Sequence, residues 1–138
     1  MYRSHITDAV QLFTNEQIIE LMPKSYKLIA QIIGVEPALH LIDAYGGTII
    51  FIPSKHALNI NHDISRVIGL TSLQKLADQF GNTTLEIPKG NPILLAVRNH
   101  HICELAKRES KPKIARKFNL TLRTIRSIVN SPKNLSSC

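Results

Sequence analysis

Apolar residues recur at helical spacing over much of the chain, and twice this pattern gives way to a short strand pattern. Residues 23–33 carry apolar positions three and four apart, which predicts a helix, and Gly34 ends it. A second helix opens at Pro37 and closes at Gly46. The β-branched and aromatic run at 48–52 then predicts a strand. The chain therefore begins with a helix–helix–strand unit.

The same order of signals returns 35 residues later. The recurring residues are Ile29, Ile33, Gly34, Leu41, Asp43, Gly46, Thr48, Ile52 and Pro53, matched by Ile64, Ile68, Gly69, Leu76, Asp78, Gly81, Thr83, Ile87 and Pro88. A fixed offset of this kind indicates an internal duplication. The sequence thus predicts two copies of one unit, with strands at 48–52 and 83–87.

Each predicted strand is short and leaves backbone N–H and C=O groups that need a partner. The expected pairing residues are Ile49, Ile50, Phe51, Ile52, Leu85 and Ile87. The partner is either the other copy in the same chain or the same strand of a second chain. Pairing within the chain is favoured, because the joined copies are at high effective concentration.

Residues 111–129 predict two short helices around a tight turn. Two apolar stripes mark the helices: Ile114, Ala115 and Phe118, then Ile125, Ile128 and Val129. Between them, Asn119 suits a left-handed backbone, and Thr121 can cap the second helix. This spacing is typical of a helix-turn-helix with Thr121 to Asn130 as its recognition helix. An ordinary helical hairpin would show the same stripes.

The charge distribution favours DNA binding over the ordinary hairpin. Residues 98–138 hold ten Lys or Arg and two Glu, a formal charge of +8, whereas the rest of the chain carries −1. The positive excess therefore coincides with the predicted helix-turn-helix, as expected for a surface that neutralises the phosphates of double-stranded DNA. The alternative is an interaction module whose basic face binds an acidic partner protein.

Helix-turn-helix geometry presents the start of the recognition helix and its next turn to the major groove. The expected base-reading residues are Leu122, Arg123, Arg126 and Ser127. Arg123 suits a guanine edge, and Leu122 suits a thymine methyl group. The expected phosphate contacts are Lys111, Lys113, Arg116, Lys117, Thr121 and Thr124.

Other classes of function have little support. His100, His101, Cys103 and Glu104 are close in sequence, but no second group at zinc-ligand spacing accompanies them. We expect no catalytic residue, no metal and no cofactor. No secretory signal opens the chain and no apolar run is long enough to span a membrane, so a cytoplasmic protein is expected.

The expected fold is mainly α-helical with two short β-strands. A duplicated helix–helix–strand domain should occupy residues 1–90, followed by a helix-turn-helix domain at 91–130 and a disordered tail at 131–138. One helix-turn-helix per chain means that a palindromic site requires two chains. The apolar helical stretch 15–34 is the expected surface between them.

The chain resembles the Mor transcription activator family of Mu-like phages. Residues 21–35, 39–47 and 50–53 are similar to that family's dimerisation region, and residues 113–118 with 120–128 are similar to its helix-turn-helix. The resemblance implies a homodimer on dyad-related half-sites, strands paired across the two-fold axis, and activation through contact with RNA polymerase. The second copy of the helix–helix–strand unit departs from the pattern, because the family normally proceeds there to its DNA-binding helices.

Overall fold

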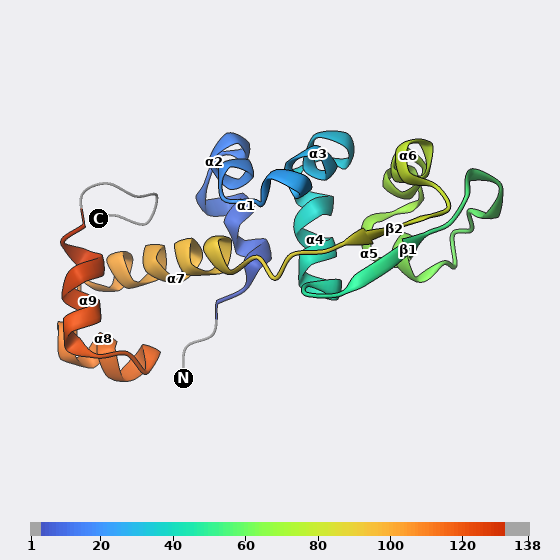
Figure 1. Cartoon of the computed structure of the whole chain (residues 1–138). Helices are drawn as coiled ribbons and strands as arrows, with labels where there is room; N and C mark the ends of the chain where they lie inside the picture. The colour runs from blue at the N-terminus through green and yellow to red at the C-terminus, as the bar shows by residue number, and fades with distance from the viewer. Residues whose placement is uncertain (1–3, 132–138) are drawn as a thin grey trace. The chain divides into compact units, whose positions relative to one another are not determined.

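The computed structural model describes residues 4–131, which are mainly helical with two short antiparallel strands (Figure 1). This confirms the predicted fold class. The elements are η1 (Ile6–Asp8), α1 (Ala9–Leu12), α2 (Asn15–Glu20), α3 (Lys24–Ile33), α4 (Val35–Tyr45), β1 (Ile49–Ile52), η2 (Lys55–Ala57), α5 (Asp63–Ile68), α6 (Leu70–Phe80), β2 (Thr83–Glu86), α7 (Asn91–Leu105), α8 (Lys111–Phe118) and α9 (Leu122–Val129). The predicted tail beyond residue 131 lies outside the described residues.

The described residues form two compact units. Residues 14–90 make up the first, here called the strand-pair unit. Residues 4–13 and 91–131 make up the second, here called the basic unit. The sequence assigned the first thirteen residues to the duplicated domain, whereas η1 and α1 contact α7 and bury Ile6 and Ala9. Their apolar pattern was too short to predict which unit they join.

The two copies of the duplicated unit fold alike. In the first, α3 and α4 lead into β1, and in the second, α5 and α6 lead into β2. Gly34 and Gly69 separate the two helices of each copy, with φ/ψ of 93/161° and 89/155°. A positive φ of this kind favours glycine, because in other residues the Cβ would crowd the neighbouring backbone atoms. The recurring glycine therefore sets the same sharp corner in both copies.

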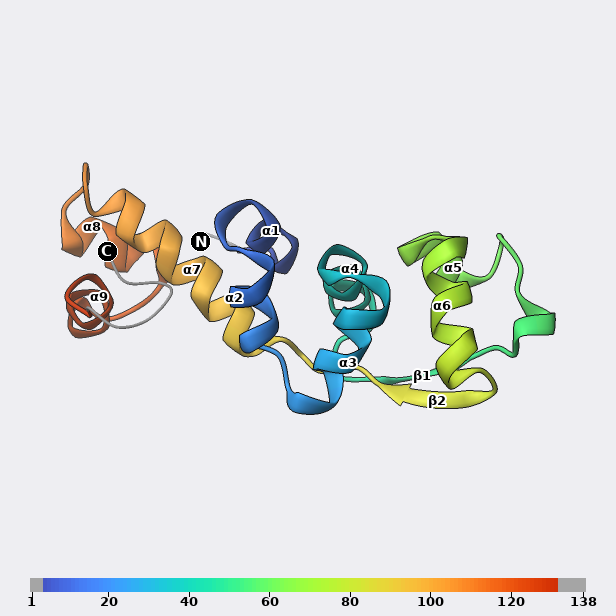
Figure 2. The same ribbon diagram turned by 90° about the horizontal axis from the view of Figure 1, so that it is seen from above.

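The strands pair within the chain. β1 and β2 are antiparallel, with Ile50 opposite Leu85 at the centre of the register. Ile87 follows β2, yet its N–H donates to the Thr48 carbonyl at 2.9 Å, so the ladder extends by one more backbone bond. Figure 2 shows α4, α5 and α6 on one side of the two strands. Ile50 and Ile52 of β1 are buried.

Contacts between the copies build the core of the strand-pair unit. Helix α4 of the first copy packs on α5 of the second, and α3 packs on α6. Leu41 and Leu76, which occupy equivalent positions, are both fully buried. Within the first copy, the Tyr26 hydroxyl donates to the Ala38 carbonyl at 2.7 Å, and burial raises the pKa of Tyr26. This bond fixes α3 against α4.

Candidate nucleic-acid interface

Helices α8 and α9 are joined by a three-residue turn with a defined backbone. Asn119 ends α8 with φ 55° and ψ 46°, in the left-handed region. The Leu120 N–H then donates to the Ala115 carbonyl at 2.9 Å, which satisfies one of the free carbonyls at the helix end. Thr121 caps α9, because its Oγ1 accepts from the Thr124 N–H at 3.1 Å. The turn residues expected from the sequence occupy these positions.

A small core holds the two helices to the end of α7. The buried residues are Ile102, Ile114, Ala115, Phe118 and Ile125, with Leu105, Ala106, Leu120, Ile128 and Val129 packed around them. Four of the six residues of the predicted apolar stripes are buried in this cluster, and the other two, Ile128 and Val129, pack against it. The buried stripes fix which faces of α8 and α9 remain outside.

The outer face of α9 carries three of the four residues assigned to base reading. Arg123, Arg126 and Ser127 are exposed, and they share one side of the helix because they are three and four residues apart. Ile125 is fully buried on the opposite side. Leu122 is partly buried. It therefore presents less surface to a ligand than the two arginines do.

The residues assigned to phosphate contacts differ in their surroundings. Lys113, Arg116, Lys117 and Thr121 are exposed, while Lys111 and Thr124 are partly buried. The hydroxyls of Thr121 and Thr124 lie 2.9 Å apart, and Thr121 also caps α9. A phosphate bound here would have to accept hydrogen bonds from hydroxyl groups that also hold the start of α9.

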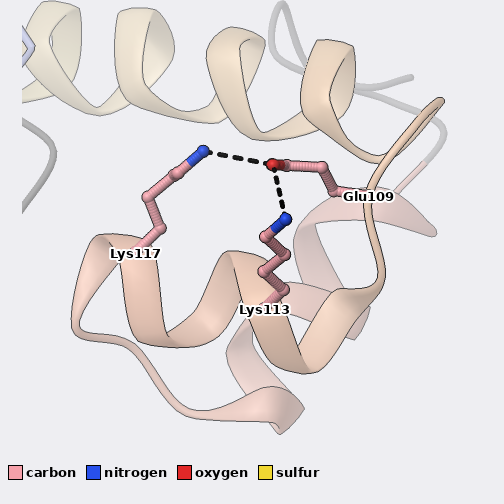
Figure 3. Close-up of polar contacts among 3 residues, drawn as sticks. All are labelled: Glu109, Lys113 and Lys117. Carbon is pink, nitrogen blue, oxygen red and sulfur yellow. Dashed lines mark hydrogen bonds and ion pairs between the residues drawn. The ribbon is translucent and has the colours of Figure 1, made fainter.

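Glu109 forms ion pairs with two of the lysines assigned to phosphate contacts (Figure 3). Its Oε1 lies 3.2 Å from the Lys117 Nζ and 3.6 Å from the Lys113 Nζ. The Glu109 side chain is only 16% exposed. The hydrogen bond with Lys117, helped by the charge of both lysines, lowers the pKa of the Glu109 carboxyl. The carboxylate therefore stays charged between the two ammonium groups at neutral pH.

Glu109 is not among the site residues predicted from the sequence. Its spacing to Lys113 is i, i+4, but Glu109 lies in the bend before α8, so the helical rule for such pairs did not indicate this contact. The contact with Lys117 spans eight residues across the turn before α8, so no helical periodicity predicts it.

The cluster of histidines on α7 packs within the basic unit. The His100 ring meets the Phe13 ring edge-on, with 5.9 Å between ring centres. Among residues 4–131, no group of three or more His, Cys, Asp or Glu side chains could hold a metal ion. None of the helices in this described range is long and apolar enough to cross a membrane.

Comparison with known proteins adds one match. Searches of curated proteins and of solved structures gave none. The model of the Mor transcription activator family matches residues 54–136, which include the second copy of the duplicated unit together with α7, α8 and α9. The first copy lies before the match, so the expectation that the second copy departs from the family pattern is wrong: the second copy is the one that the family model includes. Because the match covers more than half of the sequence, this chain belongs to the Mor transcription activator family.

Proposed function

We propose that α8 and α9 form a helix-turn-helix and that the protein regulates transcription by binding a specific sequence of double-stranded DNA. Membership of a family of transcription activators supports a regulatory role and favours activation over repression. The observation that carries the proposal is the exposed face of α9. Two arginines and a serine project there from a helix whose other side is buried, in a region of formal charge +8.

Base recognition would rest mainly on α9. Arg123 lies in its first turn, where a side chain reaches the floor of the major groove, and a guanidinium can donate two hydrogen bonds to guanine O6 and N7. Arg126 and Ser127 would reach the next base pairs or the phosphates beside them. Leu122 would make a smaller apolar contact, because part of its side chain is already covered.

Phosphate contacts would set the position of α9 in the groove. Arg116 is exposed on α8, and Lys111 stands at the start of that helix. Lys113 and Lys117 would also reach phosphates if Glu109 released them or shared them. Once bound, an activator of this family would act through contact with RNA polymerase.

Arg123→Ala tests the proposal on a duplex selected from a random pool. We expect it to cost roughly 1–3 kcal/mol of binding free energy on the selected duplex and to relax discrimination at one base pair. Arg66→Ala is a matched control, because Arg66 is an exposed arginine on α5 of the strand-pair unit. Binding of both variants can be measured by fluorescence anisotropy.

Salt dependence separates the proposal from binding to an acidic protein. Displacement of counterions from DNA gives a steep linear fall of log affinity with log salt concentration. We expect that slope, together with a clear preference for the selected duplex over random duplex. Equal affinity for all duplexes, with or without Arg123, would contradict sequence-specific reading by α9.

A further inference from the structure

We propose that the strand-pair unit is a closed, single-chain pseudo-dimer and that the protein acts as a monomer, binding one half-site without dyad symmetry. The first part stands on the arrangement of residues 14–90. The second part rests on the proposed DNA-binding function. The two parts have separate readouts, so either can fail alone.

The pairing register places a local two-fold axis through the sheet. Ile50 faces Leu85, which is its own counterpart in the second copy, 35 residues on. On one side of this central pair, Ile49 faces Glu86. On the other side, Phe51 faces Thr84, and these two are the counterparts of Glu86 and Ile49. The ladder therefore maps onto itself when the copies are exchanged.

Backbone bonds beside the strands repeat with the same symmetry. The Gly47 N–H donates to the Ile87 carbonyl at 2.8 Å, and the Asn82 N–H donates to the Ile52 carbonyl at 2.8 Å. Gly47 and Asn82 are equivalent residues, and both have positive φ, 81° and 64°. Each copy thus reaches across to the other with the same turn.

Side-chain bonds at the strand entries repeat as well. The Thr48 Oγ1 donates to the Tyr45 carbonyl at 2.6 Å, and the Thr83 Oγ1 donates to the Phe80 carbonyl at 2.6 Å. The exchange of α4–α5 and α3–α6 contacts follows the same axis. Symmetry in strands, turns and helices together means that each copy fills the place that a second chain would take.

The surface expected to join two chains is used inside the unit. The apolar side of α2 and α3 is buried, with Ile18 at 0%, Tyr26 at 2% and Ile29 at 4% exposure. Most of the apolar face predicted for residues 15–34 is therefore covered within the chain, and Leu28 is the large apolar side chain of this stretch that stays exposed, at 50%. That face packs against the chain's own helices.

The outer side of the sheet is poorly suited to a second chain. Ile49 and Phe51 are exposed there, 68% and 52%. Glu86 stands directly opposite Ile49, and Thr84 opposite Phe51, so polar groups occupy half of this side. Covering it would bury a carboxylate, which costs free energy unless a cation accompanies it.

Mass and melting of the free, full-length protein test the closed unit. Light scattering after gel filtration should give the 15.5 kDa of one chain. The melting temperature should not change over a hundredfold range of protein concentration, because folding coupled to association would make it rise with concentration. Twice the mass, or a melting temperature that rises with concentration, would overturn the proposal.

Stoichiometry on DNA tests the half-site. We expect selection from random duplex to return one non-palindromic element and native mass spectrometry to show one chain on it. A duplex carrying two inverted copies should bind two chains independently. A palindromic element filled cooperatively by two chains would overturn the half-site. Failure to bind any duplex would refute the proposed function, while mass and melting would still decide the closed unit.

Discussion

Glu109 shows how a single acid can control a basic surface. Its carboxylate sits between Lys113 and Lys117, so one negative charge offsets part of the positive charge of these two lysines in the free protein. A phosphate arriving at either lysine must compete with this carboxylate. Under the proposed function, Glu109 would weaken attraction to every duplex alike and leave discrimination to α9.

Glu109→Gln should raise affinity for selected and random duplexes together. The amide keeps the size of the side chain but removes the charge that balances the lysines, so the salt slope should steepen by about one for each lysine that reaches a phosphate. Glu104→Gln is the control, because Glu104 pairs with Lys107, which is not among the lysines assigned to phosphate contacts, and its side chain is 51% exposed. Titrations at several salt concentrations measure both slopes. If Glu109→Gln and Glu104→Gln behaved alike, neither lysine would contact DNA.

The outer residues of α9 could be predicted from the sequence, because helical periodicity alone separates Arg123 and Arg126 from the buried Ile125. Periodicity could not reveal that Thr121 and Thr124 share a hydroxyl contact or that Glu109 reaches Lys117. These contacts depend on rotamers and on the path of the chain between helices.

At the scale of elements, the turn between α8 and α9 depends on one residue. Asn119 has φ 55°, where a β-branched side chain is strained and glycine is not. Asn119→Val should lower the free energy of unfolding by about 1–2 kcal/mol, whereas Asn119→Gly should leave it nearly unchanged. Thermal melting of both variants checks this. Equal loss in both would mean that the asparagine side chain, rather than its backbone, holds the turn.

Element positions followed from the sequence more closely than element ends. The second helix was expected to open at Pro37, yet α4 begins at Val35. Gly34 caps the start of this helix. Pro37 is tolerated in the first turn, because backbone N–H groups there have no partner within the helix. The second strand was expected to reach Ile87, but β2 ends at Glu86. End positions depend on tertiary contacts, which a local pattern does not contain.

At the scale of the whole molecule, the start of the chain supports the unit that carries α8 and α9. Ile6 is 3% exposed within the basic unit. Ile6→Ala should cost roughly 2–5 kcal/mol, as expected for emptying a buried site, and should increase hydrogen exchange in α7. Ile60→Ala is the control, because Ile60 is 69% exposed. Unchanged exchange in α7 would show that residues 4–13 pack there without stabilising it.

The sequence contained the duplication, and the high effective concentration of two joined copies favoured pairing within the chain. It could not show which unit the first residues join, because a segment of ten residues has too few apolar positions to select a partner. It also could not show that the family match begins after the first copy. The second copy is followed along the chain by α7 and the basic helices α8 and α9. The first copy supplies β1, the strand that pairs with β2 of the second copy.

A fused pair of copies can change one half at a time. Where two identical chains meet, every substitution appears on both sides of the axis. Here Ala30 and Ser65 are counterparts, both buried, at 2% and 5% exposure. The Ser65 Oγ donates to the Asn59 carbonyl at 2.8 Å and so anchors the loop that joins the two copies. The counterpart of Asn59 in the first copy is Lys24, the first residue of α3, so Ala30 has no such loop to hold. Joining two halves in one chain lets each acquire a separate task while the symmetry of the backbone is kept.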